Sequence, residues 1–291
     1  MQVVIDPDAG FCFGVDTSIS LAEEYLGRAN KLYCLGELVH NEEEIVRLKK
    51  LGLMVIDYTQ FGALHNETVL IRAHGEPPST FEIARKNNLT LINSTCPIVK
   101  KLQSRVFYAN EEMLAKDGQV VIYGKEQHPE VVGLIGQTNE QAIVINSPSE
   151  VNKIDFTKKI HLFSQTTKDE AEYRMIQQII GERIMASGGD REQLLNITRS
   201  VCKQVSNRIP GIKDFAKSHE LIIFVAGKSS SNGKVLYNAA GSVNPNTHFV
   251  SSVAELNMNW FKDIDTIGVT GATSTPGWLL QQVASAIDKL F

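Results

Sequence analysis

The chain has 291 residues, 43% of them apolar and 21% charged, and carries a net charge of −4. These values are typical of a globular protein of one large or two to three ordinary domains, and they exclude a basic nucleic-acid-binding protein. Because the N-terminus lacks a signal-peptide pattern and no apolar run is long enough to span a bilayer, we expect a cytoplasmic protein that binds no nucleic acid and no membrane.

Strand-like apolar runs alternate with helix-like segments from one end of the chain to the other. The expected strands cover residues 3–5, 31–35, 68–71, 89–92, 120–123, 159–163, 221–226 and 266–269. The expected helices cover residues 16–26, 42–51, 97–115, 168–182, 234–240 and 277–290, with two more beginning near Pro78 and at Pro129. This alternation predicts an α/β protein with parallel sheets.

Two of the expected helices have a capping box at their start. Asn41 and Thr167 each lie three residues before a glutamate, so that each pair can satisfy free backbone amides at the helix end. Pro97 and Pro129 suit the first helical turn, where a backbone N–H would have no partner in any case.

Three of the four cysteines lie where an apparent strand gives way to a helix. Cys12 follows the first strand, Cys96 precedes Pro97, and Cys202 follows the apolar residues near 197–201. Ligands bind outside the carboxyl ends of strands in open α/β sheets, so three thiolates from three strand ends could form one metal site. No CxxC pair supports that hypothesis, and the alternative for each cysteine is a small buried side chain. For Cys34, inside an expected strand, we predict burial in the core.

Polar residues also collect at the ends of the expected strands. They are His40, His74, His128, Glu130, Gln165, Thr166, Thr167, Ser229, Ser230, Ser231, Asn232, Thr273, Ser274 and Thr275. Each alone is typical of a loop or a helix cap, whereas together with helix N-termini they suit a polyanion such as a diphosphate. Glu130 is a candidate proton donor, or else a first-turn glutamate that favours the helix dipole. The glycine spacings match neither a phosphate loop of NTPases nor a dinucleotide fingerprint.

The order of these motifs resembles one known family. The motifs are Gly10-Phe11-Cys12-Phe13-Gly14-Val15, Val39-His40-Asn41, Arg72-Ala73-His74-Gly75, Ser94-Thr95-Cys96-Pro97, His128-Pro129-Glu130, Gln165-Thr166-Thr167, Ser230-Ser231-Asn232 and Ser274-Thr275-Pro276. They are similar to those of the 4-hydroxy-3-methylbut-2-enyl diphosphate reductases, which catalyse the last step of the methylerythritol phosphate route to isoprenoid precursors. The resemblance extends over nearly the whole chain.

The resemblance implies three similar α/β units in a pseudo-threefold cloverleaf around a central iron–sulfur cluster. The cysteine junctions place the unit boundaries near 96 and 196, which gives units 1–96, 97–195 and 196–291. Cys12, Cys96 and Cys202 would bind one [4Fe–4S] cluster per chain. Because ordinary clusters use four cysteines, three would leave one iron open to the substrate.

The resemblance also implies a reaction and a role for each site residue. Two electrons and two protons would remove the allylic hydroxyl of the substrate to give isopentenyl and dimethylallyl diphosphates. Glu130 would deliver a proton, Thr166 would position the hydroxyl, and His128 would bind the diphosphate and could pass a proton through it. The residues expected to hold the diphosphate are His40, His74, His128, Ser230, Ser231, Asn232 and Ser274.

The electrons would come from a separate low-potential donor of the ferredoxin or flavodoxin type, since the sequence contains no flavin or nicotinamide motif. Two other functions stay open at this point. One is a [4Fe–4S] hydratase that uses the open iron without redox chemistry. The other is a redox sensor that holds an iron–sulfur cluster or a zinc ion with three cysteines and a histidine.

Overall fold

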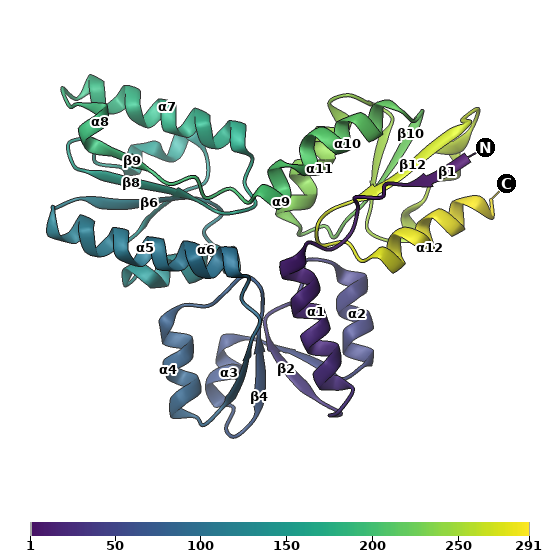
Figure 1. Cartoon of the computed structure of the whole chain (residues 1–291), viewed down its shortest axis with the longest axis horizontal. Coiled ribbons are helices and arrows are strands. Elements are labelled where there is room, and N and C mark those ends of the chain that lie inside the picture. The colour runs from purple at the N-terminus through teal and green to yellow at the C-terminus, as the bar shows by residue number, and fades with distance from the viewer. Residues whose placement is uncertain (1, 291) are drawn as a thin grey trace. The chain divides into compact units, whose positions relative to one another are not determined.

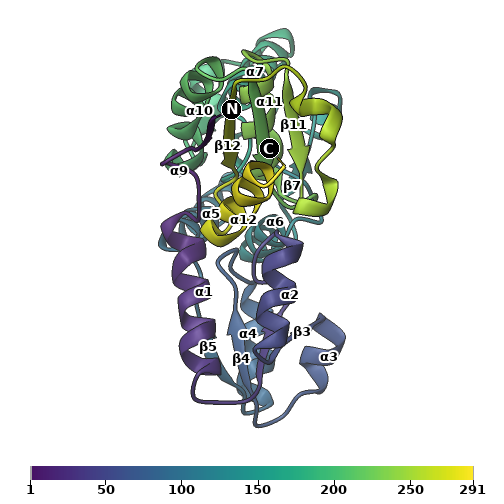
Figure 2. The same cartoon turned by 90° about the vertical axis from the view of Figure 1, so that its right-hand side faces the viewer.

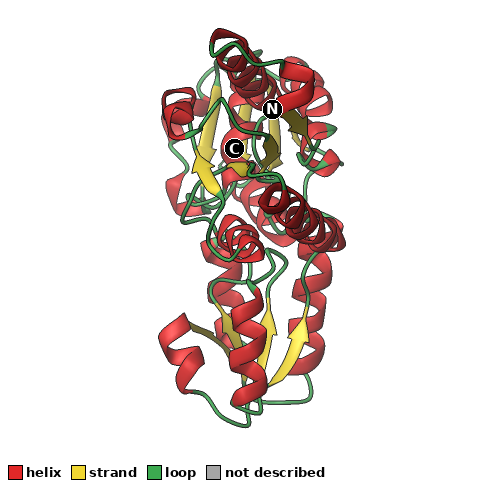
Figure 3. Ribbon diagram, turned by 90° about the vertical axis from the view of Figure 1, so that its left-hand side faces the viewer, coloured by secondary structure: helices red, strands yellow, loops and turns green. Residues whose placement is uncertain are grey.

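The structure is a computed structural model that describes residues 2–290. It confirms the predicted α/β class, because the described residues form three four-stranded sheets whose strands pair in parallel. The chain divides into two compact units: the first comprises Met1–Asp57 with Lys203–Phe291, and the second comprises Tyr58–Cys202. Figure 1 follows the chain by colour, and Figure 3 separates its helices from its strands.

The first unit contains a sheet that joins the two ends of the sequence. Its strands, in order, are β1 (Gln2–Ile5), β12 (Thr266–Gly271), β10 (Leu221–Val225) and β11 (Thr247–Val250). Residue Gln2 of β1 pairs with Thr266 of β12, so the first strand of the chain completes a sheet built otherwise from its last third.

Helices cover both faces of this sheet (Figure 1). On one face, α12 (Gly277–Asp288) buries Leu280 and Val283 against alternate residues of β10 and β12. On the other face, α10 (Arg208–Lys217) and α11 (Ser231–Gly241) bury Ile212 and Leu236. The strands therefore have two buried faces, which explains their continuous apolar runs.

The second unit repeats this layered arrangement. Its sheet consists of β7 (Ile143–Ile145), β6 (Gln119–Tyr123), β8 (Ile160–Ser164) and β9 (Leu195–Ile197), in that order. Two helices, α5 (Pro97–Ala115) and α6 (Pro129–Ile135), pack on one face, and α7 (Glu170–Ala186) packs on the other (Figure 1). The predicted site residues at the ends of these strands are therefore held in place by buried side chains on both faces of the sheet.

The remaining strands are β2 (Leu32–Leu35) and β3 (Leu53–Ile56), paired in the first unit, and β4 (Thr68–Ile71) and β5 (Thr90–Asn93), paired in the second. In the first unit, α1 (Phe13–Leu26) packs on β2 and α2 (Glu42–Lys50) packs on β3; both helices are seen in Figure 2. The shorter helices are α3 (Tyr58–Ala63), α4 (Pro78–Lys86), α8 (Arg191–Leu194), α9 (Lys203–Ser206) and the 3-10 turns Gly136–Thr138, Pro148–Lys153, Val253–Glu255 and Met258–Phe261.

All eight expected strands are present, but the prediction missed β3, β7, β9 and β11. Each of the four lies at an edge of its sheet and has only three or four residues, so its apolar signal is short. The Asn41 cap is confirmed, since its side chain accepts the Glu44 N–H at 3.0 Å. The Thr167 cap is wrong: α7 begins later, and the side chain of Asp169 accepts the amides of its first turn.

Two further expectations concern the organisation of the whole chain. No helix among residues 2–290 is long and apolar enough to cross a membrane. The unit boundaries near 96 and 196, and the arrangement of three units around a cluster, stay predictions. Any such division must place β1 with β12.

Candidate active site

The three cysteines at strand ends occupy equivalent positions in their sheets. Each follows an edge strand, namely β1, β5 or β9, and its backbone N–H donates to a carbonyl two residues beyond the end of the neighbouring strand. The three pairs are Cys12 with Thr273 at 3.0 Å, Cys96 with Ala73 at 3.0 Å, and Cys202 with Thr166 at 2.8 Å. The same local arrangement therefore places a cysteine thiol beyond an edge strand in each of the three sheets.

Each of these thiols also stands at the start of a helix. Cys12 and Cys96 are the N-cap residues of α1 and α5, and Cys202 directly precedes α9. All three are partly exposed and none forms a disulfide. Free amides at a helix N-terminus favour a thiolate, the form in which cysteine binds metals. By contrast, Cys34 is completely buried in β2, which confirms its predicted place in the core.

Glu130 is a buried carboxyl group held by one neighbouring residue. It lies in the first turn of α6, is 2% exposed, and receives two hydrogen bonds from Thr166. The Thr166 N–H donates to Oε1 and its hydroxyl donates to Oε2, each at 2.6 Å. Burial raises the pKa of Glu130 to about 7, although both hydrogen bonds from Thr166 act to lower it. The carboxyl group can therefore gain and lose a proton near neutral pH.

Two histidines lie next to this carboxyl group in the second unit. The Nδ1 atom of His128 accepts the Glu130 N–H at 3.2 Å and so caps α6, which leaves Nε2 to carry the proton of the neutral ring. The ring of His74 meets that of His128 edge-on, with centroids 5.4 Å apart. Contacts thus run from His74 through His128 and Glu130 to Thr166, whose carbonyl holds Cys202.

In the first unit, hydroxyl and amide groups gather at the N-terminus of α11. The hydroxyl of Ser230 caps the helix by accepting the Gly233 N–H at 3.0 Å, and it lies 3.1 Å from the hydroxyl of Ser274. The Asn232 amide donates to the Thr273 hydroxyl at 2.7 Å and accepts the Thr273 N–H at 3.2 Å. Because Thr273 also holds the Cys12 amide, this polar group is joined to the Cys12 segment.

His40 lies beside the loop that leads to Ser230. A Cβ atom on Gly227 would come within 2.3 Å of the His40 carbonyl oxygen, so the close approach requires glycine. The Lys228 N–H donates to the Glu42 carboxylate at 3.1 Å, which fixes the same loop at a second point. The first unit therefore brings His40 close to residues 227–232, which we call the serine loop. Ser231, the first residue of α11, is partly exposed there.

A model of the LytB protein family matches residues 3–288. This chain belongs to the LytB family. Among its relatives, the 4-hydroxy-3-methylbut-2-enyl diphosphate reductase of Phocaeicola vulgatus is 47% identical over 288 residues, covering 99% of this chain and 98% of that protein. The reductase of Parabacteroides distasonis is also 47% identical, over 290 residues, and covers 100% of this chain and 98% of the other.

Solved structures of two reductases have the same fold as this LytB chain. The (E)-1-hydroxy-2-methyl-but-2-enyl-4-diphosphate reductase of Plasmodium falciparum matches with a TM-score of 0.85 and 25% identity, over 97% of this chain and 86% of that one. A second structure, of (E)-4-hydroxy-3-methyl-but-2-enyl diphosphate reductase, matches with a TM-score of 0.70 and 32% identity, over 99% of this chain and 100% of the other.

The predicted site residues of this LytB protein are divided between the two units of the chain. Cys12, His40, the serine loop and Ser274 belong to the first unit, and the remaining predicted residues belong to the second. Thr273 is not among the predicted ligands of the diphosphate, yet its hydrogen bonds link Asn232 to Cys12. In the sequence, its position next to Ser274 is the signal that could have indicated this role. Only the hydrogen bonds distinguish it from an ordinary loop threonine.

Proposed function

We propose that this chain catalyses the reductive dehydroxylation of 4-hydroxy-3-methylbut-2-enyl diphosphate to isopentenyl and dimethylallyl diphosphates. Full-length relatives named as this reductase support the proposal. The observation that carries it in the chain itself is the buried Glu130, with a pKa of about 7, hydrogen-bonded to Thr166 and next to His128. A reaction that expels a hydroxide from carbon needs such a proton donor.

The three cysteines fit a [4Fe–4S] cluster. Their thiols are partly exposed and form no disulfide, and each cysteine lies at the beginning of a helix with its backbone N–H bonded to a carbonyl just beyond a neighbouring strand. We propose that Cys12, Cys96 and Cys202 hold one cluster per chain. When bound through three cysteines, such a cluster supplies electrons and one iron with an open coordination position.

Glu130 and Thr166 would manage the proton on the substrate hydroxyl. The C–O bond breaks, two electrons enter the allylic group, one proton converts the leaving hydroxide to water, and a second adds to an allylic carbon. Protonated Glu130 would supply the first of these protons. The Thr166 hydroxyl, which donates to Glu130, keeps lone pairs that can accept from the substrate hydroxyl and so position it.

We propose that the predicted residues of each unit include ligands of the diphosphate. The first unit offers Ser230, Ser231 and Asn232 at the N-terminus of α11, with Ser274 and His40 close to them. The second offers His74 and His128 as an edge-to-face pair. Hydroxyls, amides and imidazoles at a helix N-terminus are suited to phosphate oxygens. His128 could in addition transfer a proton through the bound diphosphate, since its Nδ1 already accepts from the Glu130 amide.

Anaerobic turnover tests the proposal directly. The protein is reconstituted with iron and sulfide, supplied with reduced viologen, and given 4-hydroxy-3-methylbut-2-enyl diphosphate. We expect substrate-dependent oxidation of viologen and both isoprenoid diphosphates as products. If protein that carries an intact cluster oxidises no viologen, the proposal is wrong. Water addition or loss without electron consumption would indicate a hydratase instead.

We further propose that a separate low-potential protein of the ferredoxin or flavodoxin type supplies the two electrons. Reconstituted enzyme should turn over when a reduced ferredoxin or flavodoxin replaces viologen as the only reductant. The measurement is product formation against the concentration of the donor protein. A rate that does not depend on the donor would contradict this assignment.

A further inference from the structure

The N-terminal half of α5 exposes a row of cations next to a proposed cluster ligand. The helix begins directly after Cys96. Lys100, Lys101 and Arg105 are all exposed on it, and Tyr108 is 71% exposed. Lys101, Arg105 and Tyr108 follow one another at spacings of four and three residues, which places them on one side of the helix. The opposite side is buried in the core of the second unit.

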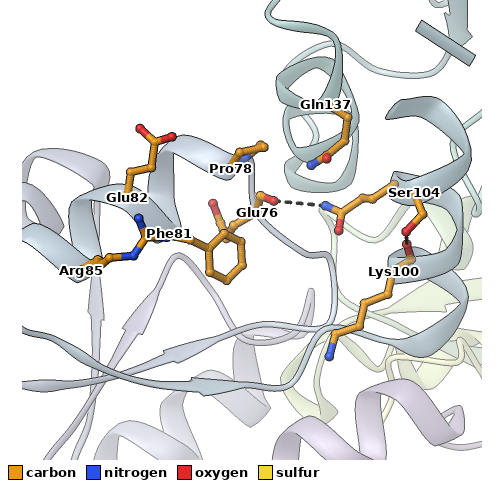
Figure 4. A pocket seen from close by; sticks show the side chains of 9 residues that line it. Glu76, Pro78, Phe81, Glu82, Arg85, Lys100, Ser104 and Gln137 are labelled. Carbon is orange, nitrogen blue, oxygen red and sulfur yellow. Dashed lines mark hydrogen bonds between the residues drawn. The ribbon is translucent and has the colours of Figure 1, made fainter. Parts of the chain in front are cut away.

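A groove runs between α4 and this part of α5. It has a volume of about 470 Å³ and is shown in Figure 4. Phe81 and Arg85 of α4 line one wall, and Lys100 of α5 lines the other. The amide of Gln103 donates to the backbone carbonyl of Glu76 at 3.2 Å and so joins α5 to the segment that leads into α4. The groove thus combines an aromatic ring with two cationic side chains.

The charge of this surface is strongly one-sided. Arg85, Lys100, Lys101 and Arg105 are exposed, and Glu82 is the exposed acid that lines the groove. Glu76 also lines it but is 1% exposed, and burial raises the pKa of its carboxyl group. Further along α5, Glu112 is paired with Lys116 at 2.6 Å.

The placement of these cations does not serve the stability of the helix. The positive end of the helix dipole lies at the N-terminus, where acidic side chains are favourable and basic ones are not. In α5 the first turn contains no acid and the last turn contains no base, whereas the basic residues lie in the N-terminal half. The charge order is therefore the reverse of the one that stabilises a helix, which favours a role in binding.

We propose that this surface docks an acidic electron-carrier protein. We call it the α5 face and define it by Arg85, Lys100, Lys101, Arg105 and Tyr108. The inference rests on the proposed function, whose two electrons must enter from outside. Cations attract an acidic partner and orient it, while Phe81 in the groove and Tyr108 provide apolar contact area. Along the helix axis, Lys100 lies about 6 Å from Cys96 and Arg105 about 14 Å, at 1.5 Å per residue.

Charge reversal on the α5 face tests this inference. The double variant Lys100→Glu/Lys101→Glu is compared with the parent enzyme, using either reduced viologen or a photoreduced acidic [2Fe–2S] ferredoxin as the electron donor. At low ionic strength we expect the KM for ferredoxin to rise about tenfold or more, with turnover on viologen unchanged. The parent's ferredoxin KM should rise with salt, and the variant's should be nearly insensitive to it.

Two further variants serve as controls for this experiment. Arg174→Glu/Arg183→Glu makes the same charge change on α7, on the opposite face of the sheet, and should leave the ferredoxin KM within about twofold of the parent. The milder Lys100→Gln/Lys101→Gln should give a smaller rise in KM, and it keeps the test valid if charge reversal prevents folding.

Three outcomes would overturn the inference. One is an unchanged ferredoxin KM in both α5 variants. Another is an equal loss with both donors, which would indicate damage to the catalytic unit. The third is that the parent binds inorganic phosphate and the variants do not, while the ferredoxin KM is the same in both. That result would show that the groove binds small anions instead. If the parent enzyme does not turn over with viologen either, the proposed function itself is wrong. The viologen measurement therefore distinguishes an error in the proposed function from an error in the docking surface.

Discussion

At the scale of single residues, Glu130 has conflicting interactions. Its carboxyl group is buried, which disfavours the charged form, yet both oxygens receive hydrogen bonds from Thr166, which favour that form. Burial has the larger effect, so the pKa rises to about 7. A carboxyl group poised in this way can donate a proton at neutral pH and be reprotonated afterwards.

Replacing Glu130 by glutamine should remove the acidic proton of the carboxyl group and keep the size and shape of the side chain. The glutamine oxygen can still accept from the Thr166 amide, so the local structure should persist. We expect kcat to fall roughly 10²–10⁴-fold with iron content unchanged, because a general acid is lost. The measurement is viologen-driven turnover. Glu126→Gln, at an exposed position in the loop that precedes α6, is the matched control and should have parental activity. Near-parental turnover in Glu130→Gln would refute the assigned role.

The same pKa predicts the dependence of the rate on pH. Proton donation needs the protonated carboxyl group, and its fraction falls as the pH rises through about 7. With viologen as the donor, kcat should therefore decline above about pH 7 and approach a tenfold loss per pH unit. A rate that is constant between pH 6 and pH 9 would show that Glu130 is not the acid in the slow step.

Glu130 should also affect stability, with a sign fixed by its raised pKa. The folded state holds the proton more tightly than the unfolded chain, so this stabilising contribution is present below pH 4.5 and is lost as the pH rises through about 7. The difference between the two pKa values corresponds to about 3 kcal/mol. From pH 5 to pH 8, the free energy of unfolding of Glu130→Gln should therefore rise by about 2–3 kcal/mol relative to the parent. Urea unfolding of the cluster-free proteins measures this, and a difference independent of pH would contradict it.

At the scale of elements, the segment between β1 and Cys12 is held by a buried ion pair. Asp6, just after β1, accepts from the Arg208 guanidinium at 2.9 Å and from the Thr270 hydroxyl at 2.6 Å. Arg208 is the first residue of α10, and its side chain is only 12% exposed. The pair therefore links the start of the Cys12 segment to the helix that follows Cys202 in the sequence. A charged group left there without its partner would be costly.

Asp6→Asn should destabilise the protein by about 2–3 kcal/mol, because it leaves the Arg208 charge poorly compensated in a nearly buried position. Denaturant unfolding of the cluster-free protein is the measurement. Asp8→Asn is a close control, since Asp8 lies 3.8 Å from the same guanidinium but its side chain is 74% exposed. That variant should lie within about 0.5 kcal/mol of the parent. Equal effects of the two substitutions would mean that burial of the pair is unimportant.

At the scale of the whole molecule, one arrangement recurs in three sheets. An edge strand leads to a cysteine, and the cysteine amide is tied to the end of the neighbouring strand. The first sheet achieves this by taking its edge strand, β1, from the opposite end of the sequence. The recurrence gives three equivalent thiols, which is the number that leaves one iron of a four-iron cluster without a protein ligand.

Substituting each cysteine in turn should separate cluster ligands from core residues. Cys12→Ser, Cys96→Ser and Cys202→Ser should each fall well below the roughly four iron atoms per chain expected of the reconstituted parent. Cys34→Ala should keep its iron, although it leaves a small cavity in the core, because Cys34 is completely buried in β2. Iron and acid-labile sulfide are the quantities measured. Full iron content in any of the three serine variants would remove that cysteine from the ligand set.

Much of the fold could be predicted from local patterns. The eight strands recognised from the sequence are apolar runs with helical segments between them, and Pro97 and Pro129 do begin helices. The four missed strands are short and lie at sheet edges, where apolar periodicity has too few residues to be distinctive. The cap at Asp169 was missed because Thr167, two residues earlier, offers an equally good local signal.

The sequence by itself determined the class of fold, the residue types at the strand ends and, through the order of its motifs, the family. Those features depend on neighbours within a few residues or on motif order, and both can be read along the chain. Only the tertiary structure decided that β1 pairs with β12 and that Thr166 holds both the carboxyl group of Glu130 and the amide of Cys202. The raised pKa of Glu130 likewise depends on burial by distant segments. These properties arise from residues far apart in the sequence, which packing alone brings together.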